Sequence, residues 1–317
     1  MKKFINRLQK VAVRFMNQLH AYDYPETAEG WYKYSDNPVL EDMSSSMFDP
    51  FVRKIKDTYY MLVSKRTTRT ILLCESVDGI CWKKRTEILF GEPNSEWETN
   101  VNRACFVVHH GYWYVWYTGQ HDGKSSIGMA ISKDGIHFEK YAHNPVLRPE
   151  LWFECCAVMN PCVIWDEEQE LFCMWYAAGE NYEPDVIGYA ESEDGVHWIK
   201  RQTPVMTADP SVEYQKCKVG ACDVIKLPDG RFCMAYIAYQ NINVARICIA
   251  YSEDGITNWK RIPENPVLSP SKGKWDQHAV YKPSLMYDVE NFVTIIWYNG
   301  RSKHSEKIGV AYLEEEL

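Results

Sequence analysis

One unit that recurs four times constrains the fold of this 317-residue chain more than any other feature. Each copy is an apolar run that ends in Ser-x-Asp-Gly, followed by a basic stretch and, in the later copies, by Pro-Val. The copies begin at Ser76, Ser132, Ser192 and Ser252, about 60 residues apart, a spacing typical of large propeller blades. Asp-Gly between two alternating runs indicates a tight hairpin turn, so each repeat contains a strand pair at this point.

A further pair of apolar runs precedes each Asp-Gly turn. Two examples are DPFVRKIKDTYYMLVS from Asp49 and PCVIWDEEQELFCMWYAAG from Pro161. Each repeat therefore has four antiparallel strands, the usual unit of a propeller. Five candidates for the innermost strand begin near Phe48, Asn102, Met159, Gly220 and Tyr281. The sequence predicts an all-β, five-bladed β-propeller with four-stranded antiparallel blades.

The two ends of the chain predict how the ring of blades closes. After the last innermost pair, KIGVAYLEEEL contains no outermost strand. A matching segment occurs near the start, where WYKYSDNPVL from Trp31 resembles NWKRIPENPVL from Asn258. An N-terminal strand in the last blade would close the ring and leave no open sheet edge. We therefore predict two parts, residues 1–30 as an amphipathic helix with a linker and residues 31–317 as the propeller.

The first twenty residues have the spacing of an amphipathic helix. Lysines and arginines separate the apolar positions Phe4, Ile5, Leu8, Val11, Ala12, Phe15, Met16 and Leu19. Two interpretations follow, a short helix packed on the propeller or a basic helix, residues 2–20, bound to an anionic membrane surface. No stretch reaches the roughly 18 apolar residues that are needed to span a bilayer.

Charge and cysteine usage limit the partners and the compartment. The formal net charge of −8 argues against a nucleic-acid-binding surface. The eleven cysteines occur mostly within apolar runs and form no Cys-x-x-Cys pair, so we expect no metal site and no cofactor. Buried free thiols are typical of a reducing compartment. We expect a cytoplasmic protein, or one that is peripheral to the inner face of the membrane.

Alignment of the innermost segments on their prolines, Pro50, Pro161 and Pro283, singles out the position just before the proline. Its occupants are Asp49, Arg103, Asn160, Ala221 and Lys282. A position that served only the fold would repeat an apolar or turn residue, whereas this one changes its polar identity between blades. Because the first strand of each blade surrounds the central channel, we expect these polar residues at the channel mouth.

Glycoside cleavage needs a proton donor and a second group on the opposite face of the sugar ring. Asp49 is the leading candidate for the central carboxylate, and the alternative is an aspartate that caps a turn or pairs with a channel arginine. Glu154 is the preferred acid, although Trp97-Glu98 before another blade favours a structural role for such acids. Asp223 lies just beyond the recurrent position, either as a further catalytic carboxylate or pointing into a blade.

Basic and aromatic side chains complete the expected site. Arg103, Lys282 and His278 would converge near one mouth and bind a phosphate or carboxylate, or else balance the charge of neighbouring acids. Trp152 and Trp275 are candidates for sugar stacking, with packing as the alternative. Other tryptophans recur with the blade period and are expected in the core: Trp116, Trp175 and Trp297.

These motifs resemble a known superfamily. Asp49-Pro50 followed by TYYMLVS, with the repeated Ser-x-Asp-Gly-x-x-Trp and Asn-Pro-Val-Leu units, is similar to the five-bladed glycoside hydrolases of the arabinanase/xylosidase, invertase/levansucrase and β-mannoside phosphorylase types. The resemblance implies that Asp49 is the first-blade base or nucleophile, or the acid of the phosphorylases. The departures are Arg103 for the second-blade Asp, Met159-Asn160 for the third-blade Glu, and Phe48 and Phe51 for the Glu and Arg of the phosphorylase segment.

The expected function is an enzyme that cleaves glycosidic bonds of an oligosaccharide at the channel mouth, with hydrolysis as the default reaction. Phosphorolysis with phosphate as second substrate, or a related glycosyl transfer, is the first alternative, because one carboxylate beside a basic cluster suits it. A non-catalytic glycan-binding propeller is the second alternative. A second carboxylate about 5 to 10 Å from Asp49 would favour hydrolysis.

Overall fold

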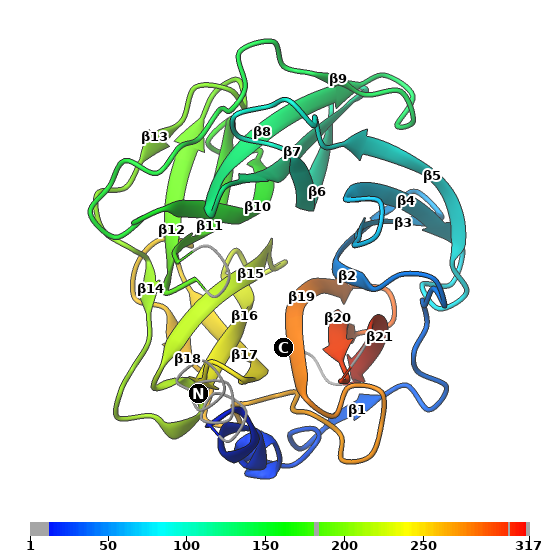
Figure 1. The fold of residues 1–317 in the computed structure, drawn as a ribbon, viewed down its shortest axis with the longest axis vertical. Helices are drawn as coiled ribbons and strands as arrows, with labels where there is room; N and C mark the ends of the chain where they lie inside the picture. The colour runs from blue at the N-terminus through cyan, green and yellow to red at the C-terminus, as the bar shows by residue number, and fades with distance from the viewer. Residues whose placement is uncertain (1–12, 181–183, 304, 315–317) are drawn as a thin grey trace, which may run out of the picture.

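The computed structural model describes residues 13–180, 184–303 and 305–314, which form antiparallel sheets around a common centre (Figure 1). One four-stranded sheet contains β2 (Met47–Ile55), β3 (Thr58–Lys65), β4 (Thr70–Ser76) and β5 (Lys83–Phe90). Another contains β15 (Lys218–Lys226), β16 (Phe232–Asn241), β17 (Val244–Ser252) and β18 (Lys260–Arg261). A third contains β19 (Ala279–Asp288), β20 (Val293–Arg301), β21 (Glu306–Leu313) and β1 (Trp31–Lys33). The expected all-β fold with four-stranded antiparallel sheets is confirmed.

A larger sheet of nine strands joins two antiparallel units. The first unit contains β6 (Asn100–His109), β7 (Tyr112–His121), β8 (Lys124–Ser132) and β9 (Glu139–Lys140). The second contains β10 (Ala157–Asp166), β11 (Leu171–Gly179), β12 (Val186–Ser192), β13 (Ile199–Lys200) and β14 (Met206–Thr207). A parallel pair, Ala157 with Ser125, connects β10 to β8.

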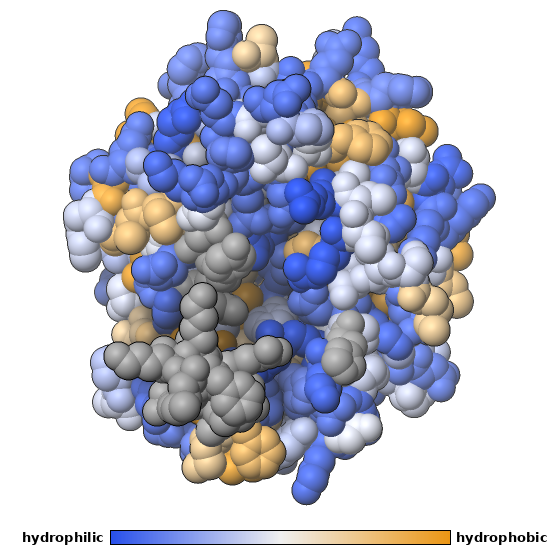
Figure 2. All heavy atoms as spheres, viewed as in Figure 1, coloured by the Kyte–Doolittle hydropathy of each residue, from blue (hydrophilic) through white to orange (hydrophobic). Residues whose placement is uncertain are grey.

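The innermost strands follow one another around the centre. Strand β2 contacts β6, β6 contacts β10, β10 contacts β15, β15 contacts β19, and β19 contacts β2. The backbone N–H of Val52 in β2 also donates to Oγ of Ser284 in β19 at 2.8 Å. Figure 2 shows a hollow at the centre of this arrangement, with hydrophilic residues gathered around it.

The Ser-x-Asp-Gly motif forms the outer hairpin turn of each unit. In the first copy, the N–H groups of Ile80 and Cys81 donate to Oδ1 of Asp78 at 2.8 and 2.7 Å. The bond from Cys81 is the main reason that the pKa of Asp78 is lowered to about 2. The turn glycine, Gly79, has a φ of 72°, which glycine adopts without steric strain. The motif therefore fixes the turn by local bonds alone.

Three buried tryptophans connect neighbouring units. Trp116, Trp175 and Trp297 are at most 1% exposed, which confirms their expected place in the core. Each indole N–H donates to the carbonyl of a turn glycine at 2.8 Å, from Trp116 to Gly195, from Trp175 to Gly255 and from Trp297 to Gly79. Because Trp297 lies in β20 and Gly79 follows β4, this bond joins the sheet of β20 to the sheet of β2.

The asparagine of the Asn-Pro-Val-Leu motif holds the third strand of a unit. Its side-chain amide accepts from the backbone N–H of one residue and donates to the carbonyl of the same residue, at 2.7 to 2.9 Å. The pairs are Asn144 with Met129, Asn265 with Ile249, and Asn37 with Val310. Asn37, which follows β1, therefore holds β21 of the last sheet in the same way that Asn144 and Asn265 hold the third strands of their units.

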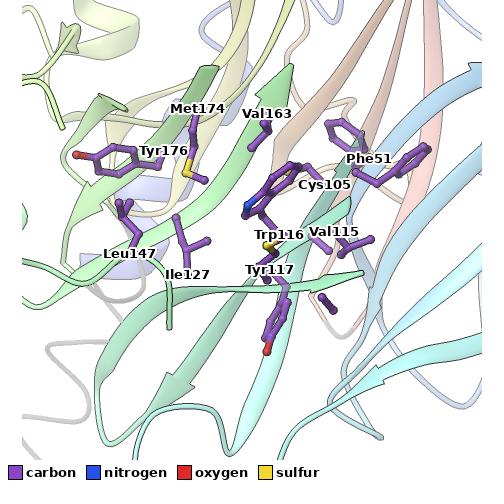
Figure 3. Close-up of a cluster of buried hydrophobic side chains, with 14 of the residues drawn as sticks. Phe51, Cys105, Val115, Trp116, Tyr117, Ile127, Leu147, Val163, Met174 and Tyr176 are labelled. Carbon is purple, nitrogen blue, oxygen red and sulfur yellow. The ribbon is translucent and has the colours of Figure 1, made fainter. Parts of the chain in front are cut away.

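The largest buried cluster fills the space between the first three units (Figure 3). Phe51 of β2 meets Phe106 of β6 edge-on, with ring centroids 5.5 Å apart. Val163, Met174 and Tyr176 contribute from the third unit. Full burial of one large apolar side chain contributes roughly 1.5–3 kcal/mol, so packing between neighbouring units is the main force that positions the innermost strands.

Residues 13–19 form a helical turn that continues into the 3₁₀ helix η1 (His20–Tyr22), while residues 1–12 of the expected N-terminal helix lie outside the described residues. Nδ2 of Asn17 donates to Oδ1 of Asn243 at 3.0 Å, and Nε2 of Gln18 donates to the carbonyl of His278 at 2.8 Å. The polar side of this segment faces the sheets, and its apolar side chains are more than half exposed: Val13, Phe15, Met16 and Leu19. In the described ranges, no helix is long and apolar enough to cross a bilayer.

Candidate active site

Each innermost strand has a β-bulge at the position that the alignment singled out, since the pairing register shifts there in β2, β6, β10, β15 and β19. The bulged residue has a positive φ in all five strands: Asp49 55°, Arg103 55°, Asn160 53°, Ala221 21° and Lys282 30°. A left-handed conformation costs a non-glycine residue roughly 1–2 kcal/mol, so the surrounding strand pairs must enforce it. The following Pro50, Pro161 and Pro283 lack an N–H, which suits the unpaired point of a bulge.

A polar pocket of about 350 Å³ lies at the centre of the molecule and brings together Asp49, Arg103 and Asn160. Other lining residues come from the second and third strands of the units, so the pocket is built by several sheets at once. Its volume is near the lower end of the range of small-molecule sites, roughly 300–1,000 Å³. A pocket of this size and polarity fits a short saccharide better than an extended apolar ligand.

Asp49 is held in place from two sides. Nε of Arg103 donates to Oδ2 of Asp49 at 3.1 Å, and the backbone N–H of Asp49 donates to Oδ1 of Asn299 at 3.1 Å. Asp49 is 8% exposed, and Nη1 of Arg103 also contacts Sδ of Met159 at 3.3 Å. The expected pairing of Asp49 with a channel arginine is therefore present inside the pocket itself, where Oδ2 is oriented and Oδ1 can face a ligand.

A second carboxylate, Glu306, lines the same pocket. The guanidinium of Arg66 binds its Oε2, and the same guanidinium lies 4.3 Å above the ring of Phe48. The sequence analysis missed Glu306, which lies two residues before Ile308. Asp185 lies at the same distance from Ile187 in an earlier repeat. Variation at this aligned position is the signal that would have identified it.

Three further pocket residues were also missed because they lie on second strands. Aligning the tyrosines of these strands, Tyr117, Tyr176, Tyr236 and Tyr298, shows a position three residues later that varies between repeats. Gln120, Tyr239 and Arg301 occupy it, and all three line the pocket.

Several buried amide atoms in the pocket have no hydrogen-bond partner among the described residues. They are Oδ1 of Asn102, Oδ1 of Asn160 and Nδ2 of Asn299, on side chains at most 4% exposed. An unpaired buried polar group costs about 1–3 kcal/mol. A ligand rich in hydroxyl groups would supply both donors and acceptors to these atoms.

The structure places Glu154 inside its own unit, against β11 and β13, and not in the pocket lining. It is fully buried, Oη of Tyr176 donates to its Oε1 at 2.7 Å, and Nζ of Lys200 donates to its Oε2 at 2.9 Å. The backbone N–H of Leu151 donates to Oε2 as well, at 2.8 Å. The carboxylate is thus enclosed by structural partners.

The same arrangement of an acid or amide, a hydroxyl and a cation recurs in three other units. Tyrosine hydroxyls donate to Glu98, Gln215 and Asp276, and the cations are Lys140, Arg261 and Lys33. In the strand register, Lys140, Lys200, Arg261 and Lys33 pair with Ala130, Ala190, Ala250 and Ala311. We call these four sets the inter-strand clamps. Glu154 thus has the same kinds of partners as Glu98 and Asp276 of the Trp-acid pairs.

Asp223 is fully buried beneath the mouth. Arg53 donates to both of its oxygens, at 2.7 and 2.9 Å, and the backbone N–H of Leu285 and Oγ of Ser284 donate to Oδ2 at 2.8 and 3.1 Å. Burial alone would raise the pKa of Asp223, but the guanidinium of Arg53 and these bonds outweigh it and lower the pKa. The carboxylate fixes the innermost strands β2, β15 and β19 to one another.

Lys282 on β19 and His278 just before β19 were both expected near the mouth, and they take different positions. Lys282 is fully buried, and its Nζ donates to the carbonyl of Cys222 at 3.0 Å, below the pocket. His278 is half-buried, and its backbone N–H donates to the carbonyl of Arg301, which lines the pocket. Burial is the main cause that lowers the pKa of His278, and the charges of Arg301, Arg14 and Lys303 lower it further.

The two tryptophans proposed for sugar stacking lie outside the pocket lining. Trp275 stacks on Tyr298 with ring centroids 5.7 Å apart. A Cβ atom at Gly300 or Gly309 would collide with its ring, so Trp275 packs over these glycines. Trp152 is 78% exposed and contacts the ring of Phe153. Within the described ranges, no group of three or more His, Cys, Asp or Glu residues is arranged to hold a metal ion.

Comparisons with known proteins agree with this architecture. Residues 99–211 match the model of the glycosyl hydrolases family 32 N-terminal domain. An uncharacterized protein of Mycobacterium tuberculosis, MT1551, is 29% identical over 201 residues, which are 60% of this chain and 62% of that protein. The chain therefore matches less than two thirds of the length of this relative.

Solved structures resemble the chain over most of its length. A glycoside hydrolase has a TM-score of 0.72 at 18% identity and covers 95% of both chains. A thermostable family-43 glycoside hydrolase has a TM-score of 0.69 at 20% identity and covers 88% of this chain and 91% of its own. The resemblance to the five-bladed glycoside hydrolases is confirmed, because the chain has their propeller-like fold and its residues 99–211 match the N-terminal domain model of family 32.

Proposed function

We propose that the sheets are the five blades of one propeller, residues 31–317, and that β1 closes the ring. Three observations support this. The innermost strands contact one another in a complete cycle, Trp297 binds the turn glycine of the first sheet, and β1 supplies the last sheet with Lys33 and Asn37 at the positions that outer strands fill elsewhere. Residues 1–30 then form a separate N-terminal segment.

We propose further that the protein is an enzyme that cleaves glycosidic bonds in the central pocket. The observation that carries this proposal is the pair of carboxylates, Asp49 and Glu306, in a hollow with unpaired amide groups. Glycosidases use two carboxyl groups, one to protonate the leaving oxygen and one to activate water or to attack the sugar. Arginines orient both carboxylates, Arg103 at Asp49 and Arg66 at Glu306.

In this mechanism Asp49 acts as the base or nucleophile and Glu306 as the proton donor. Asp49 is the more enclosed of the two at the bulge of β2, whereas Glu306 begins β21 at the mouth, where a leaving group would depart. Asn102, Asn160 and Asn299 would bind the sugar hydroxyls through their unpaired amide atoms. The catalytic roles first considered for Glu154 and Asp223 pass to Glu306, since both acids are enclosed by structural partners.

The test is a screen of the full chain against aryl glycosides and oligosaccharides, beside Asp49→Asn and Glu306→Gln. Asp229→Asn is the matched control, because Asp229 pairs with Arg231 outside the pocket. Release of free sugar that both pocket variants abolish and the control retains would establish a glycosidase. A broad panel that is bound but never cleaved would instead identify a glycan-binding propeller.

Phosphorolysis is the second candidate reaction, because three arginines line the pocket: Arg66, Arg103 and Arg301. A free phosphate between them could attack the sugar while one carboxylate protonates the leaving group. The same screen, run with and without inorganic phosphate, separates the two reactions. Sugar phosphate that forms only in the presence of phosphate would establish the phosphorylase.

We also propose that the protein works in a reducing compartment, in contact with the inner face of a membrane. Seven of the eleven cysteines are buried and free: Cys74, Cys105, Cys162, Cys173, Cys222, Cys233 and Cys248. The exposed apolar side chains of residues 13–19 lie next to Arg14, as in helices that bind anionic surfaces. Co-sedimentation with phosphatidylserine vesicles, compared between the full chain and a Phe15→Ser, Leu19→Ser variant, tests this contact.

A further inference from the structure

The charges at the pocket do not balance. Its lining contains three arginines, Arg66, Arg103 and Arg301, against two carboxylates, Asp49 and Glu306. Arg103 pairs with Asp49 and Arg66 pairs with Glu306. Among the described residues, Arg301 has no carboxylate partner, although the chain as a whole has a net charge of −8. An unpaired cation at the mouth of an acidic protein points to an anionic ligand.

The contacts of Arg301 position its guanidinium and leave part of it available for such a ligand. Its guanidinium lies 5.1 Å above the ring of Tyr281, and Nη2 donates to the carbonyl of Asn243 at 3.3 Å. Nε is buried and has no hydrogen-bond partner in the part of the chain that the structure describes. A guanidinium binds carboxylate, sulfate and phosphate groups through two parallel N–H bonds. The ring of Tyr281 and the carbonyl of Asn243 position the guanidinium, and Nε remains without a partner.

More positive charge gathers around Arg301. Arg14 from the N-terminal segment and Lys303 from the loop after β20 both act, together with Arg301, on the electrostatics of His278. Gln18 donates to the backbone carbonyl of His278, so the N-terminal segment is fixed beside Arg301. In the described ranges neither Arg14 nor Lys303 forms an ion pair. Arg301 therefore lines the pocket, and Arg14 and Lys303 add positive charge near His278, whose backbone binds that of Arg301.

We propose that Arg301 forms a subsite for an anionic substituent of the glycan, a carboxylate, sulfate or phosphate ester on the sugar itself. This inference rests on the proposed function, since it names the substrate class of the same pocket. The pocket then has two halves, an uncharged amide half for sugar hydroxyls and a cationic half for the substituent. Charge-assisted bonds contribute about 1.5–3 kcal/mol, which corresponds to a preference of about tenfold to a hundredfold for the charged sugar.

The experiment compares binding of matched pairs of 4-nitrophenyl glycosides, glucuronide with glucoside, galacturonide with galactoside, and the 6-phosphates and 6-sulfates with their parent sugars. Binding is measured by calorimetry at low and high salt with the full chain in an Asp49→Asn background, so that cleavage does not interfere. We expect at least one charged member to bind about tenfold or more tightly than its neutral partner, with a preference that falls as salt rises.

Arg301→Gln should remove this preference, so that charged and neutral partners bind with similar affinity, and Arg301→Lys should restore part of it. Arg231→Gln is the matched control, because Arg231 lies over Tyr251 at 5.2 Å and pairs with Asp229 away from the pocket. Thermal unfolding of each variant verifies that it is folded.

Equal binding of charged and neutral partners, or an equal loss of both in Arg301→Gln, would overturn the subsite. A requirement for inorganic phosphate with neutral glycosides would overturn it too, because the cations would then serve a free co-substrate. Cleavage of neutral glycosides without any charge preference would refute the subsite and leave the proposed enzyme intact. A charge preference without cleavage of any glycoside by the unmodified chain would leave the subsite intact and refute the enzyme.

Discussion

Two sets of positions repeat around this molecule, and they differ in what they keep constant. The inter-strand clamps keep their chemistry, because in four units an acid or amide meets a tyrosine hydroxyl and a cation from the outermost strand. The bulged positions keep their backbone, because all five have a positive φ, while the side chain changes from Asp to Arg, Asn, Ala and Lys. One set conserves an interaction, and the other conserves only a geometry.

The difference separates structural from functional charge within one fold. A buried carboxylate such as Glu154 is explained fully by partners that recur in the other units. Asp49 has a partner, Arg103, which occurs at this position in a single unit, and both side chains line the central pocket. Repetition with constant chemistry indicates stability, whereas constant backbone with changing chemistry indicates a site.

The largest effect is expected from Asp49→Asn. The substitution keeps the shape of the side chain and removes the charge that would act as base or nucleophile, so kcat/KM should fall by about 10²- to 10⁴-fold. The measurement is steady-state kinetics on whichever glycoside the screen identifies, with thermal unfolding as the check on folding.

Glu154→Gln is expected to have little effect on activity, in contrast to Asp49→Asn, because Glu154 belongs to an inter-strand clamp. Its kcat/KM should remain within about threefold of the unmodified chain, since it lies outside the pocket. If instead Glu154→Gln lost activity while Asp49→Asn kept it, the assignment of the two sets of positions would be reversed.

The next largest effect is expected on stability, from Lys33→Met. Nζ of Lys33 lies 2.6 Å from Oδ2 of Asp276, which is 1% exposed, so the substitution leaves a buried charge without its cation. Such a loss costs about 3–5 kcal/mol. Lys274→Met is the matched control, because its pair with Glu26 is exposed and contributes about 1 kcal/mol or less. Equal denaturant midpoints for the two variants would contradict the clamp at the junction of β1 and β21.

Much of the fold could be predicted from the sequence because short motifs form its turns and strand contacts through local hydrogen bonds. Ser-x-Asp-Gly satisfies its own backbone N–H groups, and the asparagine of Asn-Pro-Val-Leu satisfies a single neighbouring strand. Each motif therefore identifies its element without knowledge of the rest of the chain. The likeness of the segment from Trp31 to that from Asn258 was equally informative, since β1 pairs with β21 in the register that other outermost strands use.

The site was only partly predictable, because its composition depends on how strands from different units converge. The position that the alignment singled out is bulged in all five strands, and its residues Asp49, Arg103 and Asn160 line the pocket. Lys282 shares the backbone conformation but is buried below, which alignment cannot reveal. Glu306 and Arg301 lie on other strands of the same repeat. Burial and strand convergence decide which charged residue lines the pocket and which belongs to an inter-strand clamp.

A smaller effect is expected from acid on the buried pair of Asp223 and Arg53. The pKa of Asp223 is lower in the folded protein than the value near 3.9 of an unfolded chain. A lowered carboxyl pKa contributes stability above the unfolded value, and this contribution is lost as pH falls through the folded value. The stability advantage over Asp223→Asn should therefore be constant at neutral pH and shrink below about pH 4. Denaturant unfolding at a series of pH values measures this, and an advantage that stayed constant down to pH 2.5 would contradict it.

The smallest effect is the difference in the free energy of unfolding expected between two substitutions at one clamp, Glu154→Gln and Glu154→Ala. Gln215 occupies the acid position in the fourth unit, where it accepts from Tyr236 at 2.9 Å and from Arg261 at 2.9 Å. Both donors bind the one amide oxygen there, whereas Glu154 accepts on both of its oxygens. Glu154→Gln would turn an NH₂ group toward a donor and should lower the free energy of unfolding by about 1–3 kcal/mol. Glu154→Ala removes both acceptors and leaves Lys200 without its buried partner, so it should cost about 3–5 kcal/mol. Equal costs for the two would mean that the carboxylate charge, and not the remaining acceptor oxygen, holds the clamp together.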